Sequence, residues 1–523
     1  MVLDFYMKKN NLLIVLVVAL AFIFRFWNLS NLPKSLSMDE ITYGYSTYSI
    51  LKTGMDEHGN FLPLSFRGIG DYKPPVDVYL KVPFVSIFGL NEFSIRLLDA
   101  LLGSISVYVL FLILRKLKIS FYPSLLSSLW LALSGSHIFF SRSGYAAITA
   151  LFFLLLGLYS FIVWILDKKY KYFLLFLASF SLSFWSYHSE RILIPLLFLG
   201  LVVIFYKNFK DLLLSKKKLL QSVIILMLFV IPFVYELFIT KGVLPRASDL
   251  WFTKDIQDGT FFNFIKNWLG QYLQYFDLKF IFYKFLELTP KGYPDISLLN
   301  VFDAIILIFG FYFLTKTKSK LIKSIFYLII FLGPIPSAFA RGGANPTRTI
   351  IWIPALGLLM GLGFEYLVKF VRWSKLIIWG WIIGSILYFI YFAYIFINDF
   401  DKYYADLWHF GYKEASLYIC ENYQKYDKVV LTNRYGIEIP RITTIPEYYI
   451  LFYCKYDPEK YIKDPQLFNL EIRQPQWRID SQNKNYLLIG SNWDFPENFD
   501  QSKIIKKIYF PNGKEALYFV ETK

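Results

Sequence analysis

Two adjacent acids, Asp39 and Glu40, are the residues best suited to chemistry on a substrate hydroxyl. They follow closely on the first apolar segment of the chain. One carboxylate of such a pair can take a proton or hold a metal, while the other orients an acceptor or orders the loop. The alternative is a structural role, because Glu40 begins a possible helix through Thr53 and acids favour the first turn of a helix. Local sequence leaves both interpretations open.

Lys73 is a second candidate because two prolines follow it directly. Asp71 and Tyr72 precede it, and Pro74 and Pro75 come after it. Prolines hold the backbone in an extended stretch, so the ammonium group could offer a fixed cation to a phosphate at the membrane surface. The alternative is a lysine that extends its ammonium towards water at a helix start, where the prolines are ordinary first-turn residues.

Four arginines fall near the ends of apolar segments that we assign to the outer side, where topology statistics disfavour basic residues. Cations kept at such positions suggest an anionic ligand at that face. Each arginine alone could be an ordinary interfacial residue, and Arg191 has a possible partner in the adjacent Glu190. The four are Arg96, Arg142 in Ser141-Arg142-Ser143-Gly144, Arg191 in Tyr187-His188-Ser189-Glu190-Arg191, and Arg348 in Asn345-Pro346-Thr347-Arg348.

A dedicated structural zinc site is not predicted. The four histidines include no pair with the i, i+4 spacing that places two ligands on one helix face. A divalent metal at the acidic pair is left open, and no other cofactor is predicted. Asp303 lies within an apolar segment and is a candidate for that reason, with a role near the membrane interface favoured by its place close to the segment's end.

Long apolar segments must position these residues. Of the 523 residues 56% are apolar and 18% are charged, too few charges to cover a soluble protein of this size. The net charge of +16 lies in short clusters between apolar runs, which indicates membrane topology and argues against a nucleic-acid partner. Because a span needs roughly 20 apolar residues, we predict about eleven of them. They lie near residues 10–28, 95–114, 121–138, 146–166, 172–187, 191–206, 219–239, 298–315, 321–340, 348–368 and 376–398.

Basic clusters distinguish the two sides of the membrane. The first span is predicted to stay uncleaved, because no small-residue cleavage pattern follows it. Alternate connections between spans hold lysines and arginines almost without acids, and together with Lys8 and Lys9 they are predicted to be cytoplasmic. The loops 29–94 and 240–297 and the segment after residue 399 then lie outside. We therefore predict a multi-pass protein of a bacterial-type plasma (inner) membrane with a cytoplasmic N-terminus.

Residues 400–523 are predicted to form a small extracytoplasmic α/β domain beside a membrane domain of residues 1–399. Asn512-Gly513 marks the turn of a β-hairpin. Cys420 lies on the apolar stripe of an expected helix, which favours buried thiols at Cys420 and Cys454 over a disulfide between them. The expected helix is Trp408–Asn422, and the expected strands are Lys428–Thr432, Tyr448–Cys454, Tyr486–Ile489, Ile504–Phe510 and Glu515–Val520.

Taken in order, the motifs of residues 1–400 resemble the membrane glycosyltransferases that use polyprenyl-phosphate sugars. That family, glycosyltransferase family 39, includes the protein O-mannosyltransferases and the bacterial transferase that attaches aminoarabinose to lipid A. Each motif is short, and their order and topology carry the resemblance. They are Arg25, Asp39-Glu40, Lys73-Pro74-Pro75, Arg96-Leu97-Leu98, Ser141-Arg142-Ser143, Tyr187 to Arg191, Gln271 to Phe282, and Pro334 to Arg348.

The resemblance implies a GT-C fold, an all-α polytopic membrane domain whose active site lies between the outer loops and the span ends. It implies an inverting transfer of one sugar from a polyprenyl-phosphate donor to a hydroxyl of a lipid, glycan or protein acceptor. Asp39 would be the general base, with Glu40 beside it. The implied donor-phosphate residues are Lys73 and Arg348, with Arg142 and Arg191 as looser matches, and the supporting residues are Asp71, Tyr72, Arg96, Tyr187 and His188.

The chain also departs from the family pattern. Tyr145, Ala146 and Ala147 follow Arg142 where many relatives carry an acid, and Tyr72 stands before Lys73 where the lipid A enzymes have one. The second departure weakens a lipid A acceptor. An oligosaccharide ligase with a lipid-pyrophosphate donor is an alternative, although it predicts more cations in the loop 240–297. A non-catalytic transporter is another, although no internal repeat is evident.

Overall fold

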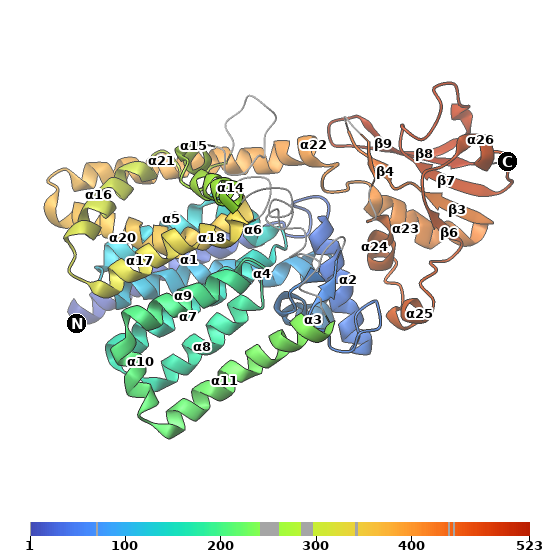
Figure 1. The fold of residues 1–523 in the computed structure, drawn as a ribbon. Helices are drawn as coiled ribbons and strands as arrows, with labels where there is room; N and C mark the ends of the chain where they lie inside the picture. Colours follow the sequence, from blue (N-terminus) through green and yellow to red (C-terminus); the bar gives the residue numbers. More distant parts are fainter. Residues whose placement is uncertain are drawn as a thin grey trace.

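The chain forms a bundle of apolar helices followed by a smaller region built on a β-sheet (Figure 1). The computed structural model describes residues 2–68, 72–240, 261–283, 296–339, 344–437, 440–442 and 445–522. Helices dominate the apolar part because a helix satisfies its backbone hydrogen bonds within one segment, as a lipid environment requires. The predicted combination of a helical membrane part and a small C-terminal sheet is confirmed.

Each of the eleven predicted spans falls on described apolar helices. Six stretches are long and apolar enough to cross a membrane, and two bent pairs, α5–α6 at 55° and α9–α10 at 91°, raise that number to eight among the described residues. The predicted span 121–138 is therefore broken, and the break falls at Ser134, which caps α6. The helices are α1 (Val2–Phe26), α4 (Glu92–Lys116), α5 (Phe121–Leu133), α6 (Gly135–Arg142), α7 (Ala146–Asp167), α8 (Tyr170–Phe184), α9 (Glu190–Ile204), α10 (Tyr206–Leu213), α11 (Lys216–Tyr235), η1 (Glu236–Thr240), α16 (Asp303–Lys316), α17 (Lys320–Leu332), α18 (Pro334–Ala338), α19 (Pro346–Thr349), η2 (Ile350–Trp352), α20 (Ile353–Phe370), α21 (Ser374–Tyr394), η3 (Ile395–Asp399) and α22 (Phe400–Tyr404).

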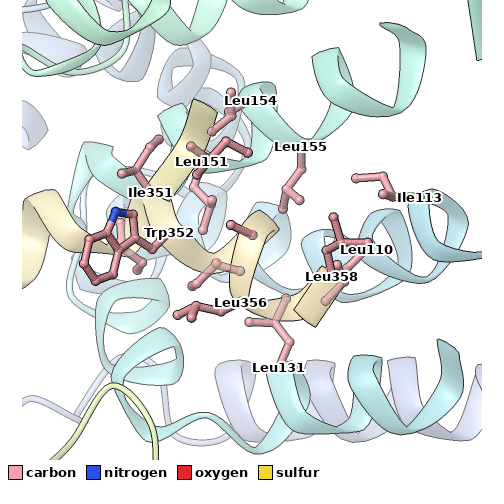
Figure 2. Packing of buried hydrophobic residues seen from close by; sticks show 14 of the residues in the cluster. Leu110, Ile113, Leu131, Leu151, Leu154, Leu155, Ile351, Trp352, Leu356 and Leu358 are labelled. Atoms are coloured by element: carbon pink, nitrogen blue, oxygen red, sulfur yellow. The ribbon is translucent and has the colours of Figure 1, made fainter. Parts of the chain in front are cut away.

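Helix α20 is the central element of the bundle. Its apolar stretch is 94% buried, whereas that of α11 is 11% buried and runs along the edge of the bundle (Figure 1). Figure 2 shows leucines of α20 packed among side chains of α4, α5 and α7. The labelled neighbours are Leu110 and Ile113 of α4, Leu131 of α5, and Leu151, Leu154 and Leu155 of α7. The centre of the bundle is therefore apolar and close-packed, and the acidic pair and Lys73 lie outside it.

Two glycines allow α16 and α20 to cross at very short distance. A Cβ atom added at Gly363 would lie 2.1 Å from the carbonyl oxygen of Ile306, and one at Gly310 would lie 2.3 Å from that of Leu359. Helices in lipid gain little from apolar burial against each other, so they associate through such close backbone contact. The Gly-mediated crossing fixes α16 against the central helix.

Two short helices and a two-stranded ribbon build the first long loop. Helix α2 (Met38–Thr53) begins at a capping box, and α3 (Val76–Phe88) begins directly after Pro74 and Pro75. Between these helices β1 (Phe66–Arg67) pairs antiparallel with β2 (Tyr72–Lys73). The second long loop is described only as α14 (Phe261–Gln274) and α15 (Leu278–Phe282).

A five-stranded mixed sheet is the centre of the C-terminal region. The strand order is β6-β3-β7-β9-β8, with β6, β3 and β7 parallel and β9 antiparallel to both of its neighbours. The predicted hairpin is confirmed, with Gly513 at positive φ in its turn. The elements are α23 (Tyr412–Asn422), η4 (Tyr423–Lys425), β3 (Lys428–Leu431), β4 (Arg434–Tyr435), β5 (Arg441–Ile442), α24 (Pro446–Tyr453), α25 (Pro458–Lys463), β6 (Leu470–Ile472), α26 (Trp477–Asp480), β7 (Tyr486–Gly490), η5 (Gln501–Lys503), β8 (Ile504–Tyr509) and β9 (Glu515–Glu521).

Three sequence predictions for this region are wrong. The expected strand Tyr448–Cys454 is helix α24, because Pro446 starts a helix and the apolar run that follows packs on two other helices. The expected helix from Trp408 begins only at Tyr412, because Gly411 adopts φ 101°. Cys420 and Cys454 form a disulfide. Their separation of 34 residues concealed this pairing, which depends on how α23 and α24 pack.

The apolar core of the C-terminal region extends into the first loop. Ile41 and Tyr45 of α2 and Ile95 of α4 belong to the same buried cluster as the residues of α23 and α24. The division into domains at residue 399/400 stays a prediction, because this shared core joins the two parts where the first loop lies between them (Figure 1).

We expect Gly363→Ala to destabilise the bundle by about 2 kcal/mol or more, because a methyl group there meets backbone that cannot rotate away. Thermal unfolding of the purified protein in detergent would measure the loss. Gly380→Ala in α21 is the matched control, because nothing lies within 4 Å of a Cβ atom at that position. Equal melting temperatures for both variants would contradict the close-crossing interpretation.

Candidate functional site

The first turn of α2 presents the acidic pair. The Glu40 amide donates to the Ser37 hydroxyl at 3.3 Å, and the Ser37 amide donates to Glu40 Oε2 at 2.7 Å. This reciprocal capping box starts the helix and assigns Glu40 the structural role that the sequence left open. The Glu40 side chain is fully buried, whereas 37% of the Asp39 side chain is exposed. Asp39 is thus the member of the pair that a substrate can reach.

A buried ion pair holds Glu40 in place. Arg96 Nε lies 2.6 Å from Glu40 Oε1, and both side chains are completely buried. The other guanidinium nitrogens of Arg96 donate to the carbonyl oxygens of Leu29, Pro33 and Ser35 at 3.0, 2.9 and 2.8 Å. All three guanidinium nitrogens of Arg96 are therefore bound within the protein, and these bonds order the chain segment that leads into α2.

Lys73 contacts the accessible acid directly. Its ammonium group bonds to Asp39 Oδ1, and 9% of the lysine side chain is exposed. The same ammonium lies 5.1 Å from the centroid of the Tyr43 ring, one helical turn after Asp39 on the same face of α2. The strand pairing of β2 with β1 and the two prolines that follow hold the Lys73 backbone. The lysine thus turns towards the acid and the ring, not towards bulk water.

Arg142 binds backbone carbonyls at the end of α1. Its guanidinium donates to the carbonyl oxygens of Phe24, Arg25 and Leu32 at 3.0, 3.1 and 3.2 Å, and the residue is 2% exposed. These bonds satisfy acceptors that the end of a helix leaves unpaired. Arg142 therefore joins α6 to α1, a role that its place at a span end did not reveal.

The turn after Arg142 packs on the acidic pair. Gly144 has φ +60°, and a Cβ atom there would lie 2.5 Å from Glu40 Cγ. Both its backbone conformation and this close approach require glycine. The α6–α7 turn therefore packs directly against the Glu40 side chain.

Arg191 lies at the end of an apolar groove. One of its terminal nitrogens is 3.5 Å from Glu236 Oε2, and its guanidinium lies 5.4 Å from the Trp185 ring. Tyr187 and His188, on the turn before it, are half-buried. Tyr187 packs against a small buried cluster that includes Tyr43 and Phe66. The groove holds about 330 Å³ between α8, α9 and α11 and is lined almost entirely by apolar side chains.

Four candidates remain, and the structure describes three of them. Arg348 is half-buried in α19 and makes no ion pair in the part of the chain that the structure describes. Tyr72 pairs with Arg67 in the ribbon beside Lys73, and Asp71 lies outside the described residues. Asp303 is buried, and its carboxylate accepts from the indole nitrogens of Trp130 and Trp381, which indicates a structural role.

The described residues do not assemble a divalent-metal site. They contain no cluster of three or more His, Cys, Asp or Glu side chains placed to hold an ion. At the acidic pair both Glu40 oxygens are bound to Arg96 and Ser37, so Asp39 is the carboxylate with a free coordination position there. One such oxygen is fewer than a divalent ion takes from a protein site of its own.

A buried charge cluster next to Tyr43 was not predicted from the sequence. Lys81 of α3 bonds to Asp77 and lies 3.1 Å from Asp99 of α4, and all three side chains are fully buried. The Thr149 hydroxyl of α7 lies 2.9 Å from Asp77. The Lys81 ammonium is 5.1 Å from the Tyr43 ring, like that of Lys73. The i, i+4 spacing of Asp77 and Lys81 and the intramembrane acid Asp99 were the available signals.

Comparison with known proteins places this arrangement in a known fold. The crystal structure of ArnT from Cupriavidus metallidurans bound to undecaprenyl phosphate aligns over 97% of both chains, with a TM-score of 0.58 and 13% identity. The apo structure of the same protein aligns over the same shares of both chains, with a TM-score of 0.53 and 12% identity. The chain has a GT-C fold. The oligosaccharyltransferase of Archaeoglobus fulgidus with zinc and sulfate aligns over 84% of this chain and 61% of its own, with a TM-score of 0.50 and 13% identity.

Sequence comparison adds a partial family match to the GT-C fold. Residues 15–242 match the family model of dolichyl-phosphate-mannose-protein mannosyltransferases. An uncharacterized protein of Aquifex aeolicus (strain VF5) is 32% identical over 180 residues, 34% of each chain, so the match spans about a third of that relative. The matched family segment contains Asp39, Lys73 and three of the four arginines. These findings confirm the predicted resemblance and the GT-C fold.

We expect Arg96→Met to destabilise the protein by about 3–5 kcal/mol, because it leaves the Glu40 carboxylate buried without its partner. Thermal unfolding in detergent would measure this change. The double variant Arg96→Met, Glu40→Gln should recover part of the loss, because glutamine keeps the capping box and removes the buried charge. A double variant less stable than Arg96→Met would contradict this account of the ion pair.

Proposed function

We propose that this GT-C protein transfers a single sugar, with inversion, from a polyprenyl-phosphate donor to an acceptor hydroxyl at the outer face of the plasma membrane. The observation that carries the proposal is the contact between the part-exposed Asp39 carboxylate and the buried Lys73 ammonium. It provides a base and a cation side by side at one end of the bundle, where the first loop meets the membrane helices (Figure 1).

The pair can divide the two tasks of the reaction. Asp39 takes the proton of the acceptor hydroxyl while the acceptor oxygen attacks the anomeric carbon. The bond from that carbon to the phosphate oxygen breaks, and polyprenyl phosphate leaves with the bonding electrons. Lys73 stabilises the negative charge that develops on this phosphate. Because the two side chains contact each other at rest, the donor phosphate must compete with Asp39 for the ammonium.

The groove beside Arg191 suits the lipid part of such a donor. Side chains of the membrane helices α8, α9 and α11 form its apolar lining, and Arg191 stands at one end of it. The Val76 amide, next to the prolines after Lys73, donates to the Trp185 carbonyl at 3.4 Å, which links the groove's arginine to the Lys73 backbone. We place the polyprenyl chain in this groove, with its phosphate between Arg191 and Lys73.

Two features support an outer location of the site. The N-terminus lies at the opposite end of the bundle from α2, α3 and the C-terminal region (Figure 1). The positive-inside rule applied to the basic clusters puts that N-terminal end in the cytoplasm. The disulfide between Cys420 and Cys454 favours an oxidising compartment for the C-terminal region.

Asp39→Asn should lower kcat by about 10²- to 10⁴-fold, because asparagine cannot accept the acceptor proton. Purified protein would be given radiolabelled polyprenyl-phosphate mannose, glucose or arabinose with candidate acceptors. Asp211→Asn, an exposed acid at the other end of the bundle, is the control. Transfer unaffected by Asp39→Asn would exclude the assigned base. Turnover of a lipid-pyrophosphate donor alone would favour the ligase alternative, and movement of lipid without transfer would favour a transporter.

Lys73→Met should lower kcat/KM for the donor by about 10²- to 10³-fold, because a fixed cation at the leaving phosphate is removed while side-chain length is kept. The acceptor KM should change little. Lys52→Met, an exposed lysine of the same loop, serves as the matched control. Equal losses in donor and acceptor parameters would count against a phosphate-binding role.

A further inference from the structure

The C-terminal region contacts the first loop next to the acidic pair. Helix α24 packs on α2 so closely that a Cβ atom at Gly44 would lie 2.5 Å from the Phe452 ring. Ile41 and Tyr45 of α2 share a buried core with Tyr449 and Phe452 of α24. The hydroxyl of Tyr45 also donates to the Tyr456 carbonyl at 3.0 Å. One whole face of α2 is therefore covered by residues of the C-terminal region.

Tyr449 makes the contact nearest to the acids. Its hydroxyl donates to the carbonyl oxygen of Leu36 across 413 residues of sequence, with the Trp408 carbonyl 3.4 Å away. The Tyr449 side chain is fully buried, and its ring lies 5.7 Å from that of Tyr412. A buried ring with neighbours on its sides has little rotational freedom, so its hydroxyl is a fixed donor.

Leu36 directly precedes Ser37, the cap of α2. The carbonyl of Ser35 accepts from Arg96 at 2.8 Å, and the next carbonyl, that of Leu36, accepts from Tyr449. Two consecutive peptide groups are thus held by two side chains, one from the membrane bundle and one from the C-terminal region. Because Asp39 lies two residues beyond the cap, the position of its carboxylate depends on both.

Two further polar contacts hold the regions together. The hydroxyls of Tyr448 and Ser46 each lie 3.0 Å from Glu57 Oε1, where they donate to it. Burial raises the pKa of the Glu57 carboxyl to about 7, and these hydrogen bonds oppose the shift only in part. Lys413 pairs with Glu92 at 2.5 Å, at the start of the helix that carries Arg96. The contact is therefore made at several points around α2.

The disulfide anchors α24 within its own region. Cys454 follows the last residue of α24, and its partner Cys420 lies in the last turn of α23. Helix α23 packs on the sheet through Ile419, in the same core as Leu431 and Leu487. The disulfide thus restrains α24, the helix that carries Tyr449, against a helix that is packed on the sheet.

We propose that the C-terminal region is a positioning element of the active site. Helix α24, through the Tyr449 hydroxyl, holds the first turn of α2 and with it the Asp39 carboxylate. The consequence for turnover rests on the proposed function, whereas the consequence for the order of α2 does not. A positioning role lowers the rate of the chemical step more than the affinity for either substrate, because the groups that bind the substrates stay in place.

Tyr449→Phe tests the proposal, because it removes one hydroxyl and keeps the packed ring. We expect hydrogen exchange at the Glu40 and Ile41 amides to become several-fold faster. The kcat for transfer should fall about tenfold, in line with the loss of one buried hydrogen bond. The KM values for donor and acceptor should stay within about twofold. Tyr456→Phe is the matched control, because among the described residues its hydroxyl bonds to the Gln466 carbonyl alone, at 3.4 Å.

Unchanged exchange at these two amides in Tyr449→Phe would overturn the proposal, as would an equal effect in Tyr456→Phe. A second variant, Cys420→Ser with Cys454→Ser, should accelerate exchange at the same amides by releasing α24. A wild-type protein without transferase activity on any donor would instead exclude the proposed function, and the exchange measurements would still decide the positioning role.

Discussion

The buried Arg96 side chain is the constraint on which the candidate site depends. A guanidinium in the low-dielectric end of a helical bundle is stable only if its charge is paired and its donors are bound. Glu40 provides the charge, and three backbone carbonyls accept from the two terminal nitrogens. Satisfying Arg96 therefore determines the path of the chain into α2 and leaves Asp39, not Glu40, for chemistry.

The same reasoning explains why several arginines are present at these span ends. Arg96 and Arg142 bind backbone carbonyls where α1 ends and the loop begins, so they replace hydrogen bonds that water cannot supply inside the bundle. An arginine at the end of a span can therefore indicate either buried backbone carbonyls outside regular helix or an anionic ligand. Arg191 and Lys73, which pair with side-chain carboxylates, are the cations that a phosphate can compete for.

Sequence patterns predicted local elements and missed contacts between residues that are far apart in the sequence. Apolar runs located helices at all eleven predicted positions, and the hairpin at Asn512-Gly513 followed from its turn residues. The strand predicted at Tyr448–Cys454 is a helix because tertiary packing outweighs the β propensity of its aromatic residues. The contact of Asp39 with Lys73 spans 34 residues and depends on how α2, β1 and β2 are arranged. Motifs singled out each residue, but no local pattern indicates their contact.

The resting contact between Asp39 and Lys73 has a consequence for the order of events under the proposed function. The Lys73 ammonium bonds to Asp39 Oδ1 at rest, so an acceptor hydroxyl that arrives first must share the carboxylate with the lysine. A donor phosphate that draws Lys73 away leaves the carboxylate to the acceptor hydroxyl at the moment when the anomeric carbon is in place. Tyr43 stays in place through this exchange, because it is buried and its ring also lies 5.1 Å from the buried Lys81 ammonium. Donor binding would thus free Asp39 for the acceptor, which favours an order in which the donor binds first.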